Sequence, residues 1–126
     1  MILSVKMRKD NIIQEKTFAF AVRIVNVYRY IVSEYNERVL SKQLLRCGTS
    51  IGANVEEAIG AQSDKDFLSK ISIAYKETRE TIYWLRLLEA TDFLTEEQSI
   101  SLLNDAKEIA KIIGKIQITI KNKLKT

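Results

Sequence analysis

Apolar and small side chains recur at intervals of three and four residues along four segments of the chain, with polar or charged side chains between them. This period places the apolar side chains on one face of an α-helix. It predicts helices over residues 11–33, 39–59, 64–90 and 96–123, and no segment shows the alternation expected of a β-strand. In the first segment the repeating positions are Ile13, Thr17, Phe20, Ile24, Val27, Ile31 and Tyr35.

The breaks between these segments are short and polar, with the sequences SEYNER, GAQSD and TDFLTEEQ. Two of them contain helix-start signals, Ser63 with Asp66 and Thr95 with Gln98, which resemble capping boxes. Short connections make consecutive helices antiparallel neighbours. The pattern therefore predicts an all-α protein, a single domain over residues 1–126 built as an up-down-up-down antiparallel four-helix bundle.

The second predicted helix contains an unusual run, RCGTSIGANVEEAIGA, which holds three of the four glycines in the chain. Gly48 and Gly52 are four residues apart and share one helix face, where small side chains let another backbone approach closely. We interpret them as close-packing residues. The contact they favour is either inside the bundle or between subunits.

The same helix carries a heptad seam in which one position is polar. The seam residues alternate by four and three, and they are Leu40, Leu44, Cys47, Ile51, Asn54 and Ala58. A buried amide needs hydrogen-bond partners, and such residues often fix the register of helices. We therefore predict a structural polar network formed by Arg46, Ser50, Asn54 and Glu57.

Composition limits the chemistry that the chain offers. The 126 residues include no histidine and one cysteine, Cys47, so an intrachain disulfide and a histidine base or ligand are both excluded. The sequence contains no phosphate-binding glycine loop. The longest apolar run is the five residues 18–22, far short of a membrane span of about 20 residues. We expect a cytoplasmic protein that is not an enzyme and has no cofactor, metal site or membrane partner.

Charge is distributed unevenly along the chain. The formal net charge is +4, and both ends of the sequence are basic. In an antiparallel bundle these ends meet at one pole, which favours contact with a polyanion. The candidate nucleic-acid-binding residues are Lys6, Arg8, Lys9, Lys107, Lys111, Lys115, Lys121, Lys123 and Lys125. The alternative is that these lysines form only the solvated face of an amphipathic helix and stabilise its dipole.

Aromatic side chains on the third helix and a second apolar row on the first exceed what one bundle buries. Tyr75, Tyr83 and Trp84 favour a subunit interface, since aromatic side chains often anchor such contacts. Packing within the bundle and stacking on nucleic-acid bases are the alternatives. The second row on the first helix consists of Phe18, Ala21, Val25, Tyr28 and Val32.

The second and third helices also carry a spaced motif. On the second helix its residues are Gln43, Leu44, Arg46, Ser50, Ile51, Asn54, Glu57 and Ala58. On the third they are Asp66, Phe67, Ile73, Ala74, Glu77, Glu80, Tyr83, Trp84 and Leu85. This motif resembles a bacterial four-helix-bundle family encoded in intervening sequences of 23S rRNA genes. The family usually has Ser where this chain has Cys47.

The resemblance implies a bundle that assembles as a homopentameric ring and has no enzymatic activity. It also implies kinship with the accessory protein of diversity-generating retroelements, which engages a reverse transcriptase and nucleic acid. We therefore predict a homo-oligomer that binds RNA or DNA non-specifically through a basic rim. The alternatives are an interaction scaffold or accessory subunit for a protein partner, such as a nucleic-acid enzyme, and a metal-dependent enzyme.

Overall fold

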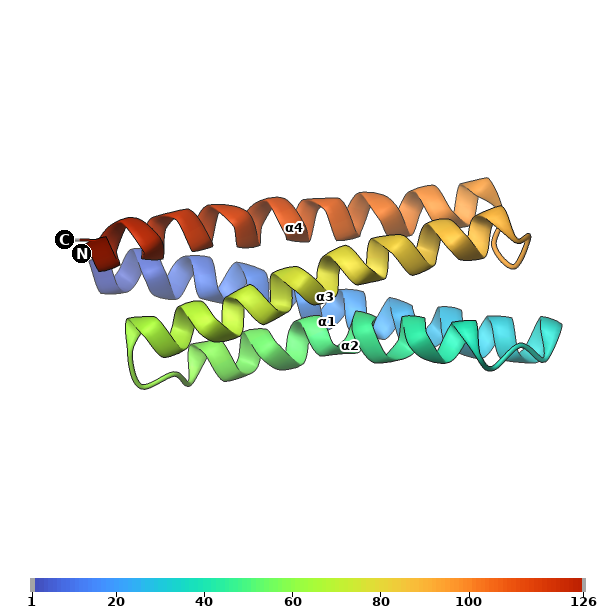
Figure 1. The fold of residues 1–126 in the computed structure, drawn as a ribbon, viewed down its shortest axis with the longest axis horizontal. Helices are drawn as coiled ribbons and strands as arrows, with labels where there is room; N and C mark the ends of the chain where they lie inside the picture. The colour runs from blue at the N-terminus through green and yellow to red at the C-terminus, as the bar shows by residue number, and fades with distance from the viewer. Residues whose placement is uncertain (1, 126) are drawn as a thin grey trace.

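The computed structural model describes the backbone of residues 2–125 and the side chains of residues 12–125, and within them it consists of four α-helices. They are α1 (Ile2–Tyr35), α2 (Leu40–Ile59), α3 (Asp64–Ala90) and α4 (Glu96–Lys125). Each helix runs opposite to the one before it, which confirms the predicted antiparallel bundle (Figure 1). None of the described helices is long and apolar enough to cross a membrane.

The predicted start of the first helix at residue 11 was wrong, because α1 begins at Ile2. Residues 2–10 contain neither proline nor glycine, so nothing in them interrupts the helical backbone. The other three helices begin and end within two residues of the expected bounds.

One apolar stripe from each helix forms the core. Side chains such as Phe20, Ile51, Leu85 and Ile113 are essentially inaccessible to solvent. Burial of each such side chain stabilises the fold by about 1.5–3 kcal/mol. The predicted stripe on the first helix is confirmed from Ile13 to Ile31, although Tyr35 at its end is exposed.

Close approach of α1 to α2 depends on two glycines in α2. A Cβ atom at Gly48 would lie 2.8 Å from Cγ1 and Cγ2 of Ile24, and one at Gly52 would lie 3.3 Å from the carbonyl oxygen of Thr17. Carbon atoms do not pack 2.8 Å apart, so Gly48 is needed if α1 is to keep its place, whereas a Cβ atom at Gly52 would make a tight contact with the backbone of α1. In this chain the close contact made by the two glycines is therefore inside the bundle.

This approach also shifts the buried seam of α2. The buried residues include Ser41 and Val55, whereas their predicted neighbours Leu40 and Asn54 are only partly buried. Ser41, Gly48 and Val55 are seven residues apart, and Gly48 is the one that contacts α1. Because α1 lies so near, the side of α2 that faces it is covered more fully than a symmetrical heptad pattern predicts.

Both predicted helix starts are capped, but only Thr95 with Gln98 forms a complete capping box, because the Asp66 carboxylate accepts from the backbone N–H of Gln62 at 3.4 Å. The Ser63 hydroxyl accepts a hydrogen bond from the backbone N–H of Asp66 at 3.1 Å. The backbone N–H of Gln98 donates to the Thr95 hydroxyl at 3.1 Å, and the backbone N–H of Thr95 donates to the Gln98 side-chain oxygen at 2.9 Å. These bonds satisfy N–H groups that the first turn of a helix leaves without an intrahelical acceptor.

The end of the bundle that holds the breaks after α1 and α3 uses polar residues where many proteins use glycine. Asn36 has a φ of 53° and Asp92 a φ of 68°, both in the left-handed region. Asn and Asp tolerate that region better than other side chains do, because their short polar groups bond locally. They reverse the chain in a protein that has no proline.

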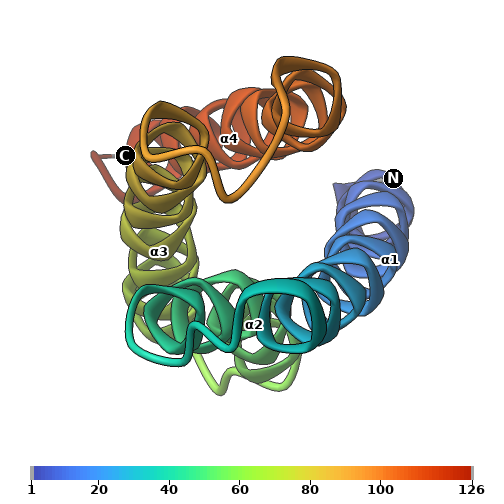
Figure 2. The same cartoon turned by 90° about the vertical axis from the view of Figure 1, so that its right-hand side faces the viewer.

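The four helices do not enclose the core evenly. Seen along the bundle, α2 and α3 form the middle of an open arrangement whose two edges are α1 and α4 (Figure 2). Helices α1 and α3 lie on opposite sides (Figure 2). Both α1 and α4 pack along an inner neighbour, and their contact with each other is much smaller. The surfaces of α1 and α4 therefore remain more accessible than those of a closed bundle.

Candidate nucleic-acid interface

Helix α4 presents a row of exposed lysines on the face opposite its core stripe. Ile109, Ile113 and Ile116 point into the bundle, and the lysines alternate with them along the helix. At a rise of 1.5 Å per residue, the row is about 27 Å long. We call this row the lysine stripe, and it consists of Lys107, Lys111, Lys115, Lys121 and Lys125.

The lysine stripe has no acidic partner among the side chains of residues 12–125. Lys123 differs, because its ammonium lies 3.0 Å from the Asp64 carboxylate and links α4 to the start of α3. The sequence analysis placed Lys123 among the candidate nucleic-acid-binding residues. The ion pair with Asp64 instead gives it a role in holding α4 against α3.

The other three candidate residues, Lys6, Arg8 and Lys9, lie outside the side chains that the structure describes. Their helix, α1, begins at the end of the bundle where α4 finishes (Figure 1). Antiparallel threading therefore brings the two basic segments to one pole, as the sequence predicts.

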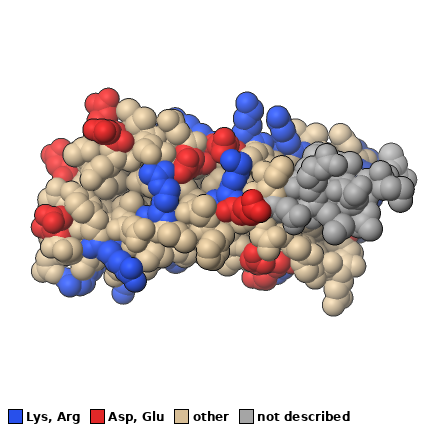
Figure 3. Space-filling view, turned by 180° about the vertical axis from the view of Figure 1, so that it is seen from behind, with Lys and Arg blue, Asp and Glu red and all other residues tan. Residues whose placement is uncertain are grey.

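The opposite pole is acidic. Acidic side chains gather at the left-hand end of Figure 3, with some basic side chains below them. The acidic residues in or beside the two breaks at this pole are Glu34, Glu37, Glu89, Asp92, Glu96 and Glu97. Acidic residues thus gather at the pole opposite the C-terminal end of α4.

Glu37, one of these acidic residues, has a local structural role that the sequence analysis missed. Its carboxylate accepts hydrogen bonds from the backbone N–H groups of Val39, Leu40 and Ser41, at 3.0, 2.8 and 2.9 Å. Burial alone would raise the pKa of Glu37, but these donors outweigh it, so its pKa lies below its usual value. The carboxylate supplies the cap that Val39, the N-cap residue of α2, cannot provide.

Two ion pairs cross the open edge between α1 and α4. The Lys16 ammonium lies 2.7 Å from the Glu108 carboxylate, and an Arg23 nitrogen lies 2.5 Å from the Asp105 carboxylate. The hydrogen bond to Glu108 and the charge of that carboxylate raise the pKa of Lys16. A signal for this edge was present in the sequence, since Lys16 and Arg23 are seven residues apart and flank the buried positions of α1.

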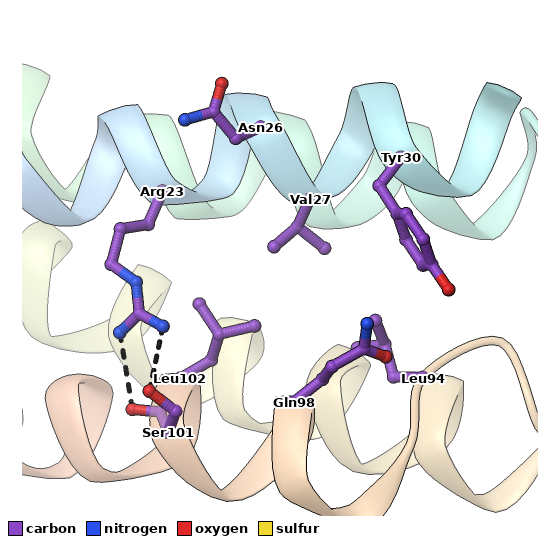
Figure 4. Close-up of a pocket in the computed structure, with 8 residues that line it drawn as sticks. All are labelled: Arg23, Asn26, Val27, Tyr30, Leu94, Gln98, Ser101 and Leu102. Atoms are coloured by element: carbon purple, nitrogen blue, oxygen red, sulfur yellow. Dashed lines mark hydrogen bonds between the residues drawn. The ribbon is translucent and has the colours of Figure 1, made fainter.

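A shallow groove of about 290 Å³ lies between the same two helices. Val27 and Leu102 extend into it from α1 and α4, and Arg23 closes one end by bonding to Ser101, both to its hydroxyl at 2.9 Å and to its carbonyl at 3.4 Å (Figure 4). Tyr30 and Gln98 face the other end (Figure 4). The groove therefore has apolar walls and polar ends.

The predicted polar network on α2 is divided between several partners. Asn54 donates to the carbonyl oxygen of Ser50 at 2.8 Å, and the Ser50 hydroxyl donates to the carbonyl oxygen of Arg46 at 2.7 Å. Glu57 pairs with Lys70 of α3 at 3.3 Å. The side chains of Ser50 and Asn54 thus bond to backbone carbonyls of α2 itself, whereas those of Arg46 and Glu57 connect α2 to α3.

Arg46 belongs to a cluster that the motif residues of α3 complete. Its guanidinium bonds to Glu80 and lies 3.4 Å from Glu77, while the Trp84 indole N–H donates to Glu80 at 3.0 Å. The Tyr83 ring meets the Trp84 ring edge-to-face, with centroids 5.2 Å apart. Motif residues from both helices therefore meet on one surface of the bundle.

Groups suited to metal binding or nucleophilic chemistry are sparse. Residues 12–125 contain no cluster of three or more carboxylate, thiol or imidazole side chains placed to hold a metal ion. Cys47 is fully buried, and burial raises the pKa of its thiol to about 11.

Comparison with known proteins identifies the family. The chain is similar to a protein of unknown function from the S23 ribosomal protein family of Bacteroides thetaiotaomicron, whose structure has been solved. The two sequences are 53% identical, and the match covers 90% of this chain and 98% of the other. The structures superpose with a TM-score of 0.85. No curated protein matches. The family model for 23S rRNA-intervening sequence proteins matches residues 9–115. The chain therefore belongs to the 23S rRNA-intervening sequence protein family.

Proposed function

We propose that this protein is a homo-oligomeric bundle that binds RNA or DNA through phosphate charge at the lysine stripe. The observation that carries the proposal is a row of five exposed lysines on one helix face, without an acidic partner among residues 12–125. Unpaired ammonium groups on a rigid helix attract polyanions and release the counterions that surround them.

The shape of the stripe favours the nucleic-acid backbone over the bases. A duplex presents a phosphate charge about every 1.7 Å along its axis, so a row about 27 Å long meets many of them. The stripe itself contains no aromatic side chain on which a base would stack. Binding is therefore non-specific, and duplexes bind at least as well as single strands.

Assembly strengthens this binding. In a cyclic oligomer every subunit points in the same direction about the axis, so the basic poles gather on one rim. Each further stripe that reaches the same nucleic acid binds at a high effective concentration. The oligomer would thus bind more tightly than an isolated subunit.

The test is a titration of labelled duplex RNA, duplex DNA and single strands at about 50 and 200 mM salt. A protein with six or more phosphate contacts loses about a thousandfold or more in affinity over that range. Lys111→Gln combined with Lys115→Gln should weaken binding about tenfold or more and flatten the salt dependence. The matched control, Lys42→Gln with Lys76→Gln, removes equal charge from exposed positions on α2 and α3 and should have little effect. No binding by the unaltered protein at low salt would refute the proposal.

A second candidate function is that of an accessory subunit that holds a protein partner, and the apolar groove between α1 and α4 favours it. A partner helix would place apolar side chains against Val27 and Tyr30. This function predicts no nucleic-acid binding at low salt together with loss of partner binding after Tyr30→Glu, a change at an exposed side chain of the groove, in a protein that keeps its helical circular dichroism.

A further inference from the structure

Gly114 lies inside α4 at a position where the bundle gives no reason for a glycine. A glycine within a helix is less favourable than an alanine, because its backbone loses more freedom on folding. Gly48 and Gly52 of α2 lie where α1 approaches closely, but a Cβ atom at Gly114 would meet nothing within 4 Å. Packing within the chain therefore does not account for the missing side chain.

The open space at Gly114 lies within the lysine stripe. Lys107 and Lys121 are each seven residues from Gly114, so they lie nearly in line with it, about 10 Å before and after it along α4. Lys111 and Lys115 are exposed beside it. Basic side chains also project from the upper edge of the molecule, which α4 forms (Figures 1 and 3). We call the gap at Gly114 between these lysines the Gly114 notch.

The other neighbours on α4 leave the notch open. Gln117, one turn beyond Gly114, is directed to α3, where its side-chain amide donates to the Ser72 hydroxyl at 3.2 Å. That bond holds the Gln117 side chain away from the space above Gly114. Ile118, four residues beyond Gly114 on the same face, is 62% exposed and presents carbon atoms among the lysines. The notch therefore has charged rims and one apolar wall.

A sugar–phosphate backbone has the chemistry that such a notch accepts. Its phosphate oxygens accept hydrogen bonds from lysine ammonium groups, and its sugar carbons can pack against an isoleucine. Glycine is the residue that lets a ligand come close to a protein backbone. A nucleic-acid strand carries a negative charge about every 3.4 Å, so its charges are dense enough for lysines on every side of the notch. Charge complementarity therefore favours a nucleic-acid strand as the occupant.

We propose that a nucleic-acid strand comes closest to α4 at Gly114, with Lys111 and Lys115 bonded to its phosphates and Ile118 against its sugars. This inference rests on the proposed nucleic-acid binding at the lysine stripe and assigns the point of closest contact. It also accounts for a glycine that lowers the stability of α4, since residues that serve binding often lower stability. Phosphates and sugar carbons are common to RNA and DNA, so both occupy the notch in the same way.

The test compares the unaltered protein with Gly114→Ala and Gly114→Leu, each titrated with labelled duplex DNA and duplex RNA at low and high salt. Both changes should raise the temperature of unfolding, because both residues favour the helix more than glycine does. Gly114→Leu should nevertheless weaken binding about tenfold and flatten its salt dependence, and Gly114→Ala should weaken binding by a smaller factor. The matched control, Asn122→Leu, places the same side chain at an exposed α4 position that already carries one of similar size, and it should bind like the unaltered protein.

The results separate this inference from the function on which it rests. No binding by the unaltered protein at low salt would overturn both. Binding that is lost in the lysine variants but unchanged in Gly114→Leu and Gly114→Ala would overturn the notch alone. A loss confined to RNA or to DNA would overturn the assignment to the backbone that they share. If Gly114→Leu forms a smaller assembly than the unaltered protein in light scattering, the notch is a contact between subunits and the inference also fails.

Discussion

Ile24 of α1 occupies the space beside Gly48 of α2, where a Cβ atom would lie 2.8 Å from two of its side-chain carbons. Ile24 is fully buried, so it cannot swing away from the added atom. The glycines of α2 are therefore part of the bundle core, and the contact gives the first prediction.

Gly48→Ala should lower the free energy of unfolding by about 1–2 kcal/mol. Overpacking costs about 1–3 kcal/mol, and the better helix propensity of alanine offsets up to about 1 kcal/mol of it. Gly114→Ala is the control, because a Cβ atom there meets nothing within 4 Å, and it should stabilise the protein by about 0.5–1 kcal/mol. Urea denaturation measures both changes. Equal stabilisation by the two changes would contradict the close approach of α1 to α2.

Glu37→Gln should destabilise the protein by about 0.5–2 kcal/mol near pH 7, because it removes a charged cap from α2. The folded pKa of Glu37 lies below its ordinary value of 4.5. The stabilisation from the carboxylate is therefore complete above about pH 4.5 and is lost as the pH falls through the lower folded value. Urea denaturation from pH 7 to pH 3 should show the two proteins converging in acid. Glu34→Gln, at an exposed position nearby, should leave the stability unchanged throughout.

Cys47 should resist alkylation in the folded protein, because it is fully buried and the pKa of its thiol is raised to about 11. The neutral thiol is favoured in the fold, so its stabilising effect holds below an ordinary pKa of 9.0 and declines as the pH rises from there to about 11. Mass spectrometry after timed labelling measures the rate. Ala53→Cys in a Cys47→Ser background places a thiol at an exposed position and should react rapidly. Equally fast labelling of Cys47 in the native protein would show that α2 is not packed as described.

The Arg23 and Asp105 pair should contribute little to stability despite its short distance. Both side chains are well exposed, at 40% and 46%, and pairs of this kind couple by about 0.2–1 kcal/mol. A double-mutant cycle with Arg23→Gln and Asp105→Asn, followed by urea denaturation, measures the coupling directly. The coupling free energy between the two side chains should fall further in about 0.5 M salt, which screens exposed charges. A coupling of several kcal/mol would mean that the edge between α1 and α4 is less accessible than the structure indicates.

Local sequence signals were enough to predict the helices of this protein and two of their caps. Capping residues and apolar periodicity act within a few neighbours along the chain, so Ser63 and Thr95 could be recognised directly. The pairing of Lys16 with Glu108 spans 92 residues and depends on how α1 and α4 are placed in space. The burial of Val55 in place of Asn54 depends on the approach of α1. Relationships of this second kind required the structure.

The lysines of α4 were likewise predictable as a group, but their separate roles were not. Periodicity predicts that Lys111 and Lys115 share one outer face of the helix, and both are exposed in the structure. Nothing in the local sequence distinguishes Lys123, whose partner Asp64 belongs to another helix. The exposed Tyr83 and the partly buried Tyr75 differ for a similar reason, since the placement of the helices in space decides which ring the bundle covers.

The open edge between α1 and α4 has a consequence for the order in which the protein loosens. A helix that packs closely along only one neighbour has fewer buried contacts to break, so its amide hydrogens exchange with solvent at a lower opening free energy. Hydrogen exchange should therefore be slowest in α2 and α3 and faster in α1 and α4. Local opening of α1 or α4 would thus leave the inner hairpin of α2 and α3 intact.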